Sequence, residues 1–67
     1  MIELTSLLSN LRITFDIKDI RAIVELNQGS KIYFYSDLKL TQNVSEDYDT
    51  VIKSLKKNAV IEAYLNR

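Results

Sequence analysis

The last third of the chain, residues 44–67, carries the pattern that most restricts how the whole chain can fold. Apolar side chains recur there at the three- and four-residue spacing of one helix face, and neither Pro nor Gly interrupts them. The stripe consists of Tyr48, Val51, Ile52, Leu55 and Ala59. The pattern predicts one long helix, and we expect the shorter segments before it to be strands that this helix covers.

The charges of this segment agree with a helix that begins near its first residues. Ser45 is the predicted N-cap, because its hydroxyl can accept a free backbone N–H of the first turn. We expect Asn58 to be the weak point, where the helix can end or bend. Acidic residues come first and basic residues later, which matches the helix dipole; they are Glu46, Asp47, Asp49, Lys53, Lys56 and Lys57.

Beyond Asn58 the segment is apolar around most of the helix circumference. A helix of that kind is normally buried, and one helix cannot present all of these side chains to one sheet. They either complete the core of the same chain or form a dimer seam or docking helix, and we favour the second interpretation. The residues concerned are Val60, Ile61, Tyr64 and Leu65.

The segments before the helix have the patterns of short strands and tight turns. Residues 2–7 and 11–15 alternate apolar and polar side chains, which predicts a hairpin with a turn at residues 8–10. Residues 20–26 are rich in β-branched side chains but break the period of two, which predicts a bulge or a helical turn near Arg21 and Ala22. The other expected elements are a hairpin turn at residues 27–30, which hold the only Gly, and strands at residues 31–35 and 38–44.

Together these elements predict an α+β fold: a small antiparallel sheet of four to five strands followed by one C-terminal helix. A chain of 67 residues makes a single domain, 1–67. The predicted core consists of Leu4, Ile13, Phe15, Val24, Ile32, Phe34, Leu40, Val51, Ile52 and Leu55.

The composition argues against an enzyme. The chain has no His and no Cys, which removes the commonest nucleophile and base systems, disulfides and ordinary zinc sites. It has no glycine-rich phosphate loop, and the acids at residues 46–49 lack the spacing of a calcium loop, so we interpret them as a dipole-matched helix start. We therefore predict no catalytic residues, no cofactor and no metal.

Nine basic and nine acidic residues cancel. Zero net charge argues against a dedicated nucleic-acid binder and removes the repulsion between copies of the chain, so we expect a homodimer or another homo-oligomer. We interpret the helix lysines as a solvated face. We see no signal peptide and no apolar run of membrane-spanning length, so we expect a cytoplasmic protein without membrane insertion.

Tyr33 and Tyr35 stand on the same side of the strand predicted at residues 31–35, opposite Ile32 and Phe34. If Ile32 and Phe34 face the helix, the two tyrosines lie on the other face of the sheet. There they can close a second small core, anchor a protein interface or stack nucleobases. The predicted partner interface therefore comprises Tyr33, Tyr35, Val60, Ile61, Tyr64 and Leu65.

The opening Met1-Ile2-Glu3-Leu4-Thr5-Ser6-Leu7 resembles the start of the small FlbD/SwrD-type flagellar proteins and of similar short phage and prophage proteins. Ile20, Ile23 and Glu25 are similar to the family's Ile-x-x-Ile-Glu stretch, and Val44, Glu46 and Val51 to its strand-to-helix junction. The resemblance runs from Met1 to about Lys57. It implies a compact, cytosolic, non-enzymatic bacterial module whose partners are proteins.

The predicted function is thus a small interaction or regulatory module that binds a protein and self-associates, in motility or as a phage accessory protein. Two alternatives stay open. One is a small nucleic-acid-binding protein that uses the strand tyrosines and the helix lysines, and the other is a phage-encoded inhibitor of a host enzyme.

Overall fold

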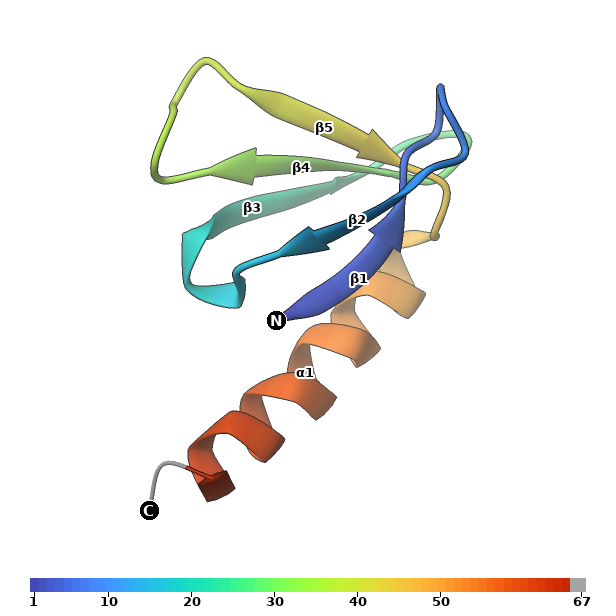
Figure 1. Ribbon diagram of the computed structural model, residues 1–67. Helices are drawn as coiled ribbons and strands as arrows, with labels where there is room; N and C mark the ends of the chain where they lie inside the picture. The colour runs from blue at the N-terminus through green and yellow to red at the C-terminus, as the bar shows by residue number, and fades with distance from the viewer. Residues whose placement is uncertain (66–67) are drawn as a thin grey trace.

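The computed structural model describes residues 1–65, and their side chains up to residue 61. Its elements in chain order are β1 (Ile2–Thr5), β2 (Arg12–Phe15), the short 3-10 helix η1 (Ile17–Asp19), β3 (Ile20–Glu25), β4 (Ser30–Phe34), β5 (Thr41–Val44) and α1 (Tyr48–Leu65) (Figure 1). The predicted α+β class, with antiparallel strands followed by a C-terminal helix, is confirmed.

The strands form two antiparallel sheets, whereas one was expected. β1 pairs with β2, and the second sheet has the order β3-β4-β5. An isolated bridge between Ser6 and Val44 joins the sheets, and beside it the Ser45 N–H donates to the Thr5 carbonyl at 2.8 Å. The pairing between the two sheets does not extend further along β1, because Ser6 already belongs to the β1–β2 turn. There the Ser6 N–H donates to the Leu11 carbonyl at 2.8 Å.

The turns and the irregular strand lie where the sequence predicts them. Asn10 has a φ of +58° in the β1–β2 turn, and Gly29 has a φ of +76° in the β3–β4 turn. The register of β3 shifts between Ile20 and Ala22, so Arg21 is the extra residue of a bulge. The predicted hairpins and the predicted bulge are therefore confirmed. They could be predicted because residue types that favour positive φ, and a broken alternation, are local signals.

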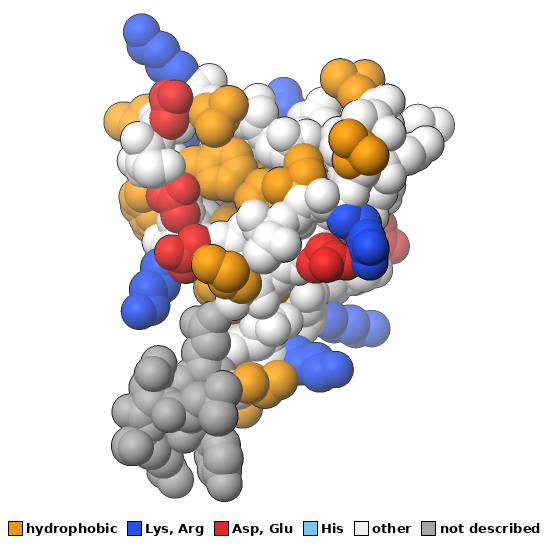
Figure 2. Space-filling model, viewed as in Figure 1, with side chains coloured by type: hydrophobic (Ala, Val, Ile, Leu, Met, Phe, Trp, Pro, Cys, Tyr) orange, Lys and Arg blue, Asp and Glu red, His pale blue; other side chains and the backbone are white. Residues whose placement is uncertain are grey.

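The core lies between the two sheets and the first half of α1. Phe15 of β2 and Phe34 of β4 stack with their ring centroids 5.7 Å apart, so the main aromatic contact joins the two sheets. Figure 2 shows hydrophobic side chains gathered between them. The buried apolar residues are Ile2, Leu4, Phe15, Ile32, Phe34, Val44 and Val51.

Most of the predicted core residues are buried or packed against the core, but two are not. Ile13 and Leu55 pack partly buried against it, and Ile52 is half-buried. The prediction was wrong for Val24, which is 45% exposed because it lies opposite Lys31 on the other face of the sheet. It was also wrong for Leu40, which is 52% exposed.

Leu40 is exposed because the last strand is shorter than predicted. Alternation over residues 38–44 indicated a strand, but β5 begins only at Thr41. The preceding residues form a turn around Asp37, whose carboxylate accepts the Lys39 N–H at 3.0 Å and whose carbonyl accepts the Leu40 N–H at 3.1 Å. The backbone of Leu38 and Leu40 is thus part of a turn, and both side chains are exposed.

The helix begins later than predicted and does not break. Asp47, not Ser45, is the N-cap: its carboxylate accepts the Thr50 N–H at 2.8 Å, and its carbonyl accepts the Val51 N–H at 3.0 Å. Ser45 lies in a bend beside β1, where its N–H donates to the Thr5 carbonyl. At Asn58 the side-chain amide donates to the Ser54 carbonyl at 2.8 Å, and α1 continues to Leu65.

Glu46, between β5 and α1, connects the parts of the fold. Its carboxylate accepts the Thr5 N–H at 2.8 Å and the Thr5 hydroxyl at 3.0 Å. Its own carbonyl accepts the hydroxyl of the fully buried Ser30 at 2.9 Å. One residue therefore joins β1, the β3–β5 sheet and the start of the helix.

Candidate interaction surfaces

The register of the three-stranded sheet divides its side chains into two faces. Residues directly opposite each other on antiparallel strands point to the same side. Ile32 is fully buried, so Tyr33 and its cross-strand partners Ala22 and Thr41 point away from the core. We call this side the outer sheet face; it comprises Arg21, Ala22, Val24, Lys31, Tyr33, Thr41 and Asn43.

The two predicted tyrosines both lie on or beside the outer sheet face. Tyr33 is half-buried, with the Arg21 guanidinium carbon 5.5 Å from its ring centroid, a distance typical of a cation–π contact. The Arg21 Nε also donates to the Phe34 carbonyl at 3.3 Å, which fixes the side chain over the strand. Tyr35, just beyond β4, is 62% exposed.

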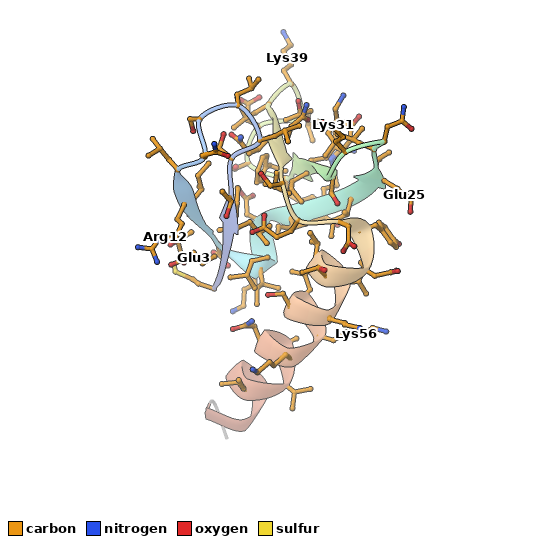
Figure 3. All side chains as sticks on the ribbon, turned by 90° about the vertical axis from the view of Figure 1, so that its right-hand side faces the viewer. Glu3, Arg12, Glu25, Lys31, Lys39 and Lys56 are labelled. Atoms are coloured by element: carbon orange, nitrogen blue, oxygen red, sulfur yellow. The ribbon has the colours of Figure 1, made fainter. Side chains whose placement is uncertain are left out.

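A shallow hollow continues the outer sheet face toward the β1–β2 turn. It has a volume of about 260 Å³ and is lined by Leu8, Lys31, Thr41, Gln42 and Asn43. Leu8 is 94% exposed at the tip of the turn. Figure 3 shows Lys31 and Lys39 pointing upward, away from α1.

The second surface is the distal half of α1, by which we mean residues 56–65. The helix packs against β1 and β3 through its first half, with Val51 fully buried and Leu55 partly buried. Figure 1 shows that the rest of the helix runs away from both sheets. Val60 is 70% and Ile61 45% exposed there.

The predicted interface therefore divides into two separate surfaces. Tyr33 and Tyr35 belong to β4 and the residue beyond it, whereas Val60 and Ile61 lie on the part of α1 that projects from the opposite side of the molecule (Figure 1). The side chains of Tyr64 and Leu65 lie outside the described residues. Arg21 was not predicted to take part, although the broken alternation around it was a signal that its side chain lies out of the ordinary register.

A third feature is an acidic pocket between the β3–β4 turn and the start of α1. Its volume is about 360 Å³, and its lining includes the carboxylates of Glu25, Asp47 and Asp49 beside Leu26 and Tyr48. Hydrogen bonds from the Thr50 side chain and backbone, helped by the nearby Lys53 ammonium, lower the pKa of Asp47 below its ordinary value of 3.8. The Asp47 carboxylate thus caps the helix. Within the described residues, no group of three or more side chains is arranged to hold a metal ion.

Comparison with protein-family models, with curated proteins and with solved structures found no match to this chain. Over residues 1–65, no helix has both the length and the apolar character needed to cross a membrane.

Proposed function

We propose that the protein is a non-enzymatic interaction module that binds protein chains, and that one of its partners is a second copy of itself. The observation that carries this proposal is the distal half of α1, where Val60 and Ile61 are exposed on a helix segment that projects beyond the sheets. Apolar helix faces are normally covered, and the described residues of α1 that pack against the core, Val51 and Leu55, lie in its first half.

The charges of α1 support a second copy as the partner. Asp47 and Asp49 lie at its start, and Lys56 and Lys57 precede the exposed Val60. In an antiparallel pair of helices, the lysines of one copy approach the acidic pocket of the other. The same pocket offers Leu26 and Tyr48 to the apolar side chains that follow the lysines. Attraction between unlike charges would set the orientation, and apolar burial would supply most of the affinity.

Sedimentation equilibrium over a range of concentrations tests this proposal. We expect a dimer that Lys57→Glu weakens, that Asp49→Lys weakens, and that the two changes together restore, because the contact is reciprocal. Val60→Lys should also give a monomer, whereas Leu8→Lys, a matched change of an exposed apolar residue, should not. A wild-type chain that stays monomeric at several hundred micromolar would exclude self-association.

The resemblance of Met1–Leu7 and of the strand-to-helix junction to the FlbD/SwrD-type flagellar and phage proteins supports a setting in motility or in a phage. We propose one of these two settings for the module. Deletion of the gene should impair swimming without changing growth if the setting is motility. Expression that begins only after prophage induction would instead assign the protein to a phage.

A further inference from the structure

The zero net charge of the chain is the sum of charges that the fold separates. Five carboxylates each accept a backbone N–H at a turn, a cap or the joint between the sheets; they are Asp16, Asp19, Asp37, Glu46 and Asp47. Glu3 pairs with Arg12 at 3.4 Å on the two-stranded sheet, and Glu25 and Asp49 line the acidic pocket. Five of these eight acidic groups therefore accept backbone N–H groups, and the other three lie on the two-stranded sheet or at the acidic pocket.

The outer sheet face carries basic rather than acidic side chains. Lys31 lies at one of its register positions and Arg21 at its bulge, over Tyr33. Lys39 lies in the turn beside the face, together with Asp37. Among the side chains of residues 1–61, none is a carboxylate within ion-pair distance of these three cations. Figure 3 shows Glu25 at the lower edge of the sheet, separate from Lys31 and Lys39. A ligand on this face therefore meets Arg21 and Lys31 without a carboxylate among the outer-face residues, while the Asp37 carboxylate lies in the same turn as Lys39 and accepts its backbone N–H.

The same face also offers planar groups and hydrogen-bonding side chains. Tyr35 is 62% exposed, and Tyr33 carries the Arg21 guanidinium over its ring, which leaves the outer side of that cation as a second flat surface. Thr41 and Asn43 line the neighbouring hollow together with Lys31. Aromatic rings and guanidinium planes on an uncovered sheet stack bases, and nearby cations follow the phosphates.

From this combination we propose that the outer sheet face binds single-stranded nucleic acid. Stacking on Tyr35 and on the Arg21–Tyr33 pair holds the bases, while Lys31 and Lys39 contact the backbone phosphates. An acidic protein segment would satisfy the cations but leave the flat surfaces unused, so the nucleic acid fits the face better. This activity is separate from the proposed self-association, because the distal half of α1 projects from the other side of the molecule.

Fluorescence anisotropy with a labelled oligothymidine of twelve nucleotides, titrated with the full chain at two salt concentrations, tests the proposal. We expect saturable binding that weakens with salt, and Lys31→Gln should reduce the slope of log affinity against log salt by about 0.7. Tyr35→Ala should weaken binding by about five-fold to a hundred-fold, the range found for single stacking residues. Arg12→Gln is the matched control, since Arg12 lies on β2 across the molecule from Lys31 (Figure 3), and it should change the affinity less than two-fold.

Three results would overturn the proposal. One is the absence of saturable binding at low salt, and another is equal loss of affinity in Lys31→Gln and Arg12→Gln. The third is displacement of the oligonucleotide by polyglutamate as effectively as by unlabelled oligothymidine, which would show recognition of negative charge alone. If Tyr35→Ala melts below the wild type, amide chemical shifts of the wild-type chain decide: shift changes confined to residues outside 20–44, the segment that holds β3, β4, β5 and their connections, would exclude this face.

Discussion

Gly29 lies where the β3–β4 turn passes closest to the end of β5. Its φ of +76° is unfavourable for residues with a side chain, and a Cβ added here would overlap the Val44 carbonyl oxygen. The neighbouring backbone cannot move away easily, because Val44 is fully buried and bridges to Ser6. The conformation of one residue thus controls how closely the turn and the joint between the sheets can pack.

We expect Gly29→Ala to lower the free energy of unfolding by roughly 3 kcal/mol, because the variant combines backbone strain with a steric clash. Urea denaturation measures the change. Asn10→Gly is the matched control, since Asn10 also has a positive φ. It should alter stability by less than about 1 kcal/mol, because glycine tolerates that conformation. A Gly29→Ala protein as stable as the control would show that the turn can relax.

Asp47 should make stability depend on pH in the acid range. Its pKa in the folded protein is lowered, first by the hydrogen bonds from Thr50, so the folded protein holds the proton less tightly than the unfolded chain. The stabilisation is therefore fully present above the unfolded value of 3.8 and is lost as the pH falls through the folded value. We expect Asp47→Asn to be less stable than the wild type at neutral pH, with the difference shrinking below pH 3.8 in urea titrations. A constant difference at every pH would contradict this assignment.

Several residue-level predictions succeeded because they rested on local chemistry. Asn10 and Gly29 were placed at turns by residue type alone, and both have positive φ. The N-cap was wrong because Ser45 and Asp47 are both good caps, and the choice depends on a partner far away in the sequence. The Ser45 N–H pairs with the Thr5 carbonyl, so Ser45 stays outside the helix, which begins after it.

At the scale of elements, the two halves of α1 have different roles. The first half covers the core with Val51 and Leu55, and the distal half projects beyond it. The sequence showed this division indirectly, since the apolar stripe is narrow up to Ala59 and spreads around the helix after it. The strand predicted at residues 38–44 was too long because alternation cannot distinguish a strand from a turn closed by Asp37.

Truncation separates the two halves. A chain that ends at Lys57 should still unfold cooperatively, because the buried helix residues are retained, but it should lose self-association. A chain that ends at Asn43 should not fold, because it loses Val44, Val51 and the Glu46 contacts together. Circular dichroism melts and proton NMR spectra show whether each of the two truncated chains folds. A dispersed spectrum with a cooperative melt from the shorter chain would show that the sheets do not need the helix.

At the scale of the whole molecule, the two sheets depend on each other. Few contacts join their backbones, but Phe15 and Phe34 stack across the interior and the α1 side chains cover both sheets. The class of the fold could be predicted from the order and length of the elements. The division into two sheets could not, because it depends on where β1 leaves β5, and no local pattern specifies that point. Tyr33, Tyr35, Val60 and Ile61 were predicted as parts of one interface, whereas the structure places them on two separate surfaces.

The dependence of the sheets on each other predicts one unfolding unit. We expect Phe34→Ala to cost about 3–5 kcal/mol, the usual loss for a buried phenylalanine and enough to unfold a domain of this size. Under conditions in which this variant is still mostly folded, amide exchange should be faster in β1 and β2 as well as in β4, because the stacked Phe15 loses its partner. Exchange that accelerates only in β3, β4 and β5 would mean that the hairpin of β1 and β2 is stable on its own. A melting temperature within a degree or two of the wild type would exclude Phe34 from the core.

The hydrogen bonds between Thr5 and Glu46 have a consequence for biosynthesis. The ribosome synthesises β1 first, and the Glu46 carboxylate that accepts the Thr5 N–H and hydroxyl follows 41 residues later. Until Glu46 and Val51 have been synthesised, the β1–β2 hairpin therefore exposes its apolar side. Ribosomes that stall within the last third should deliver species that proteases and chaperones recognise, while completed chains should escape both.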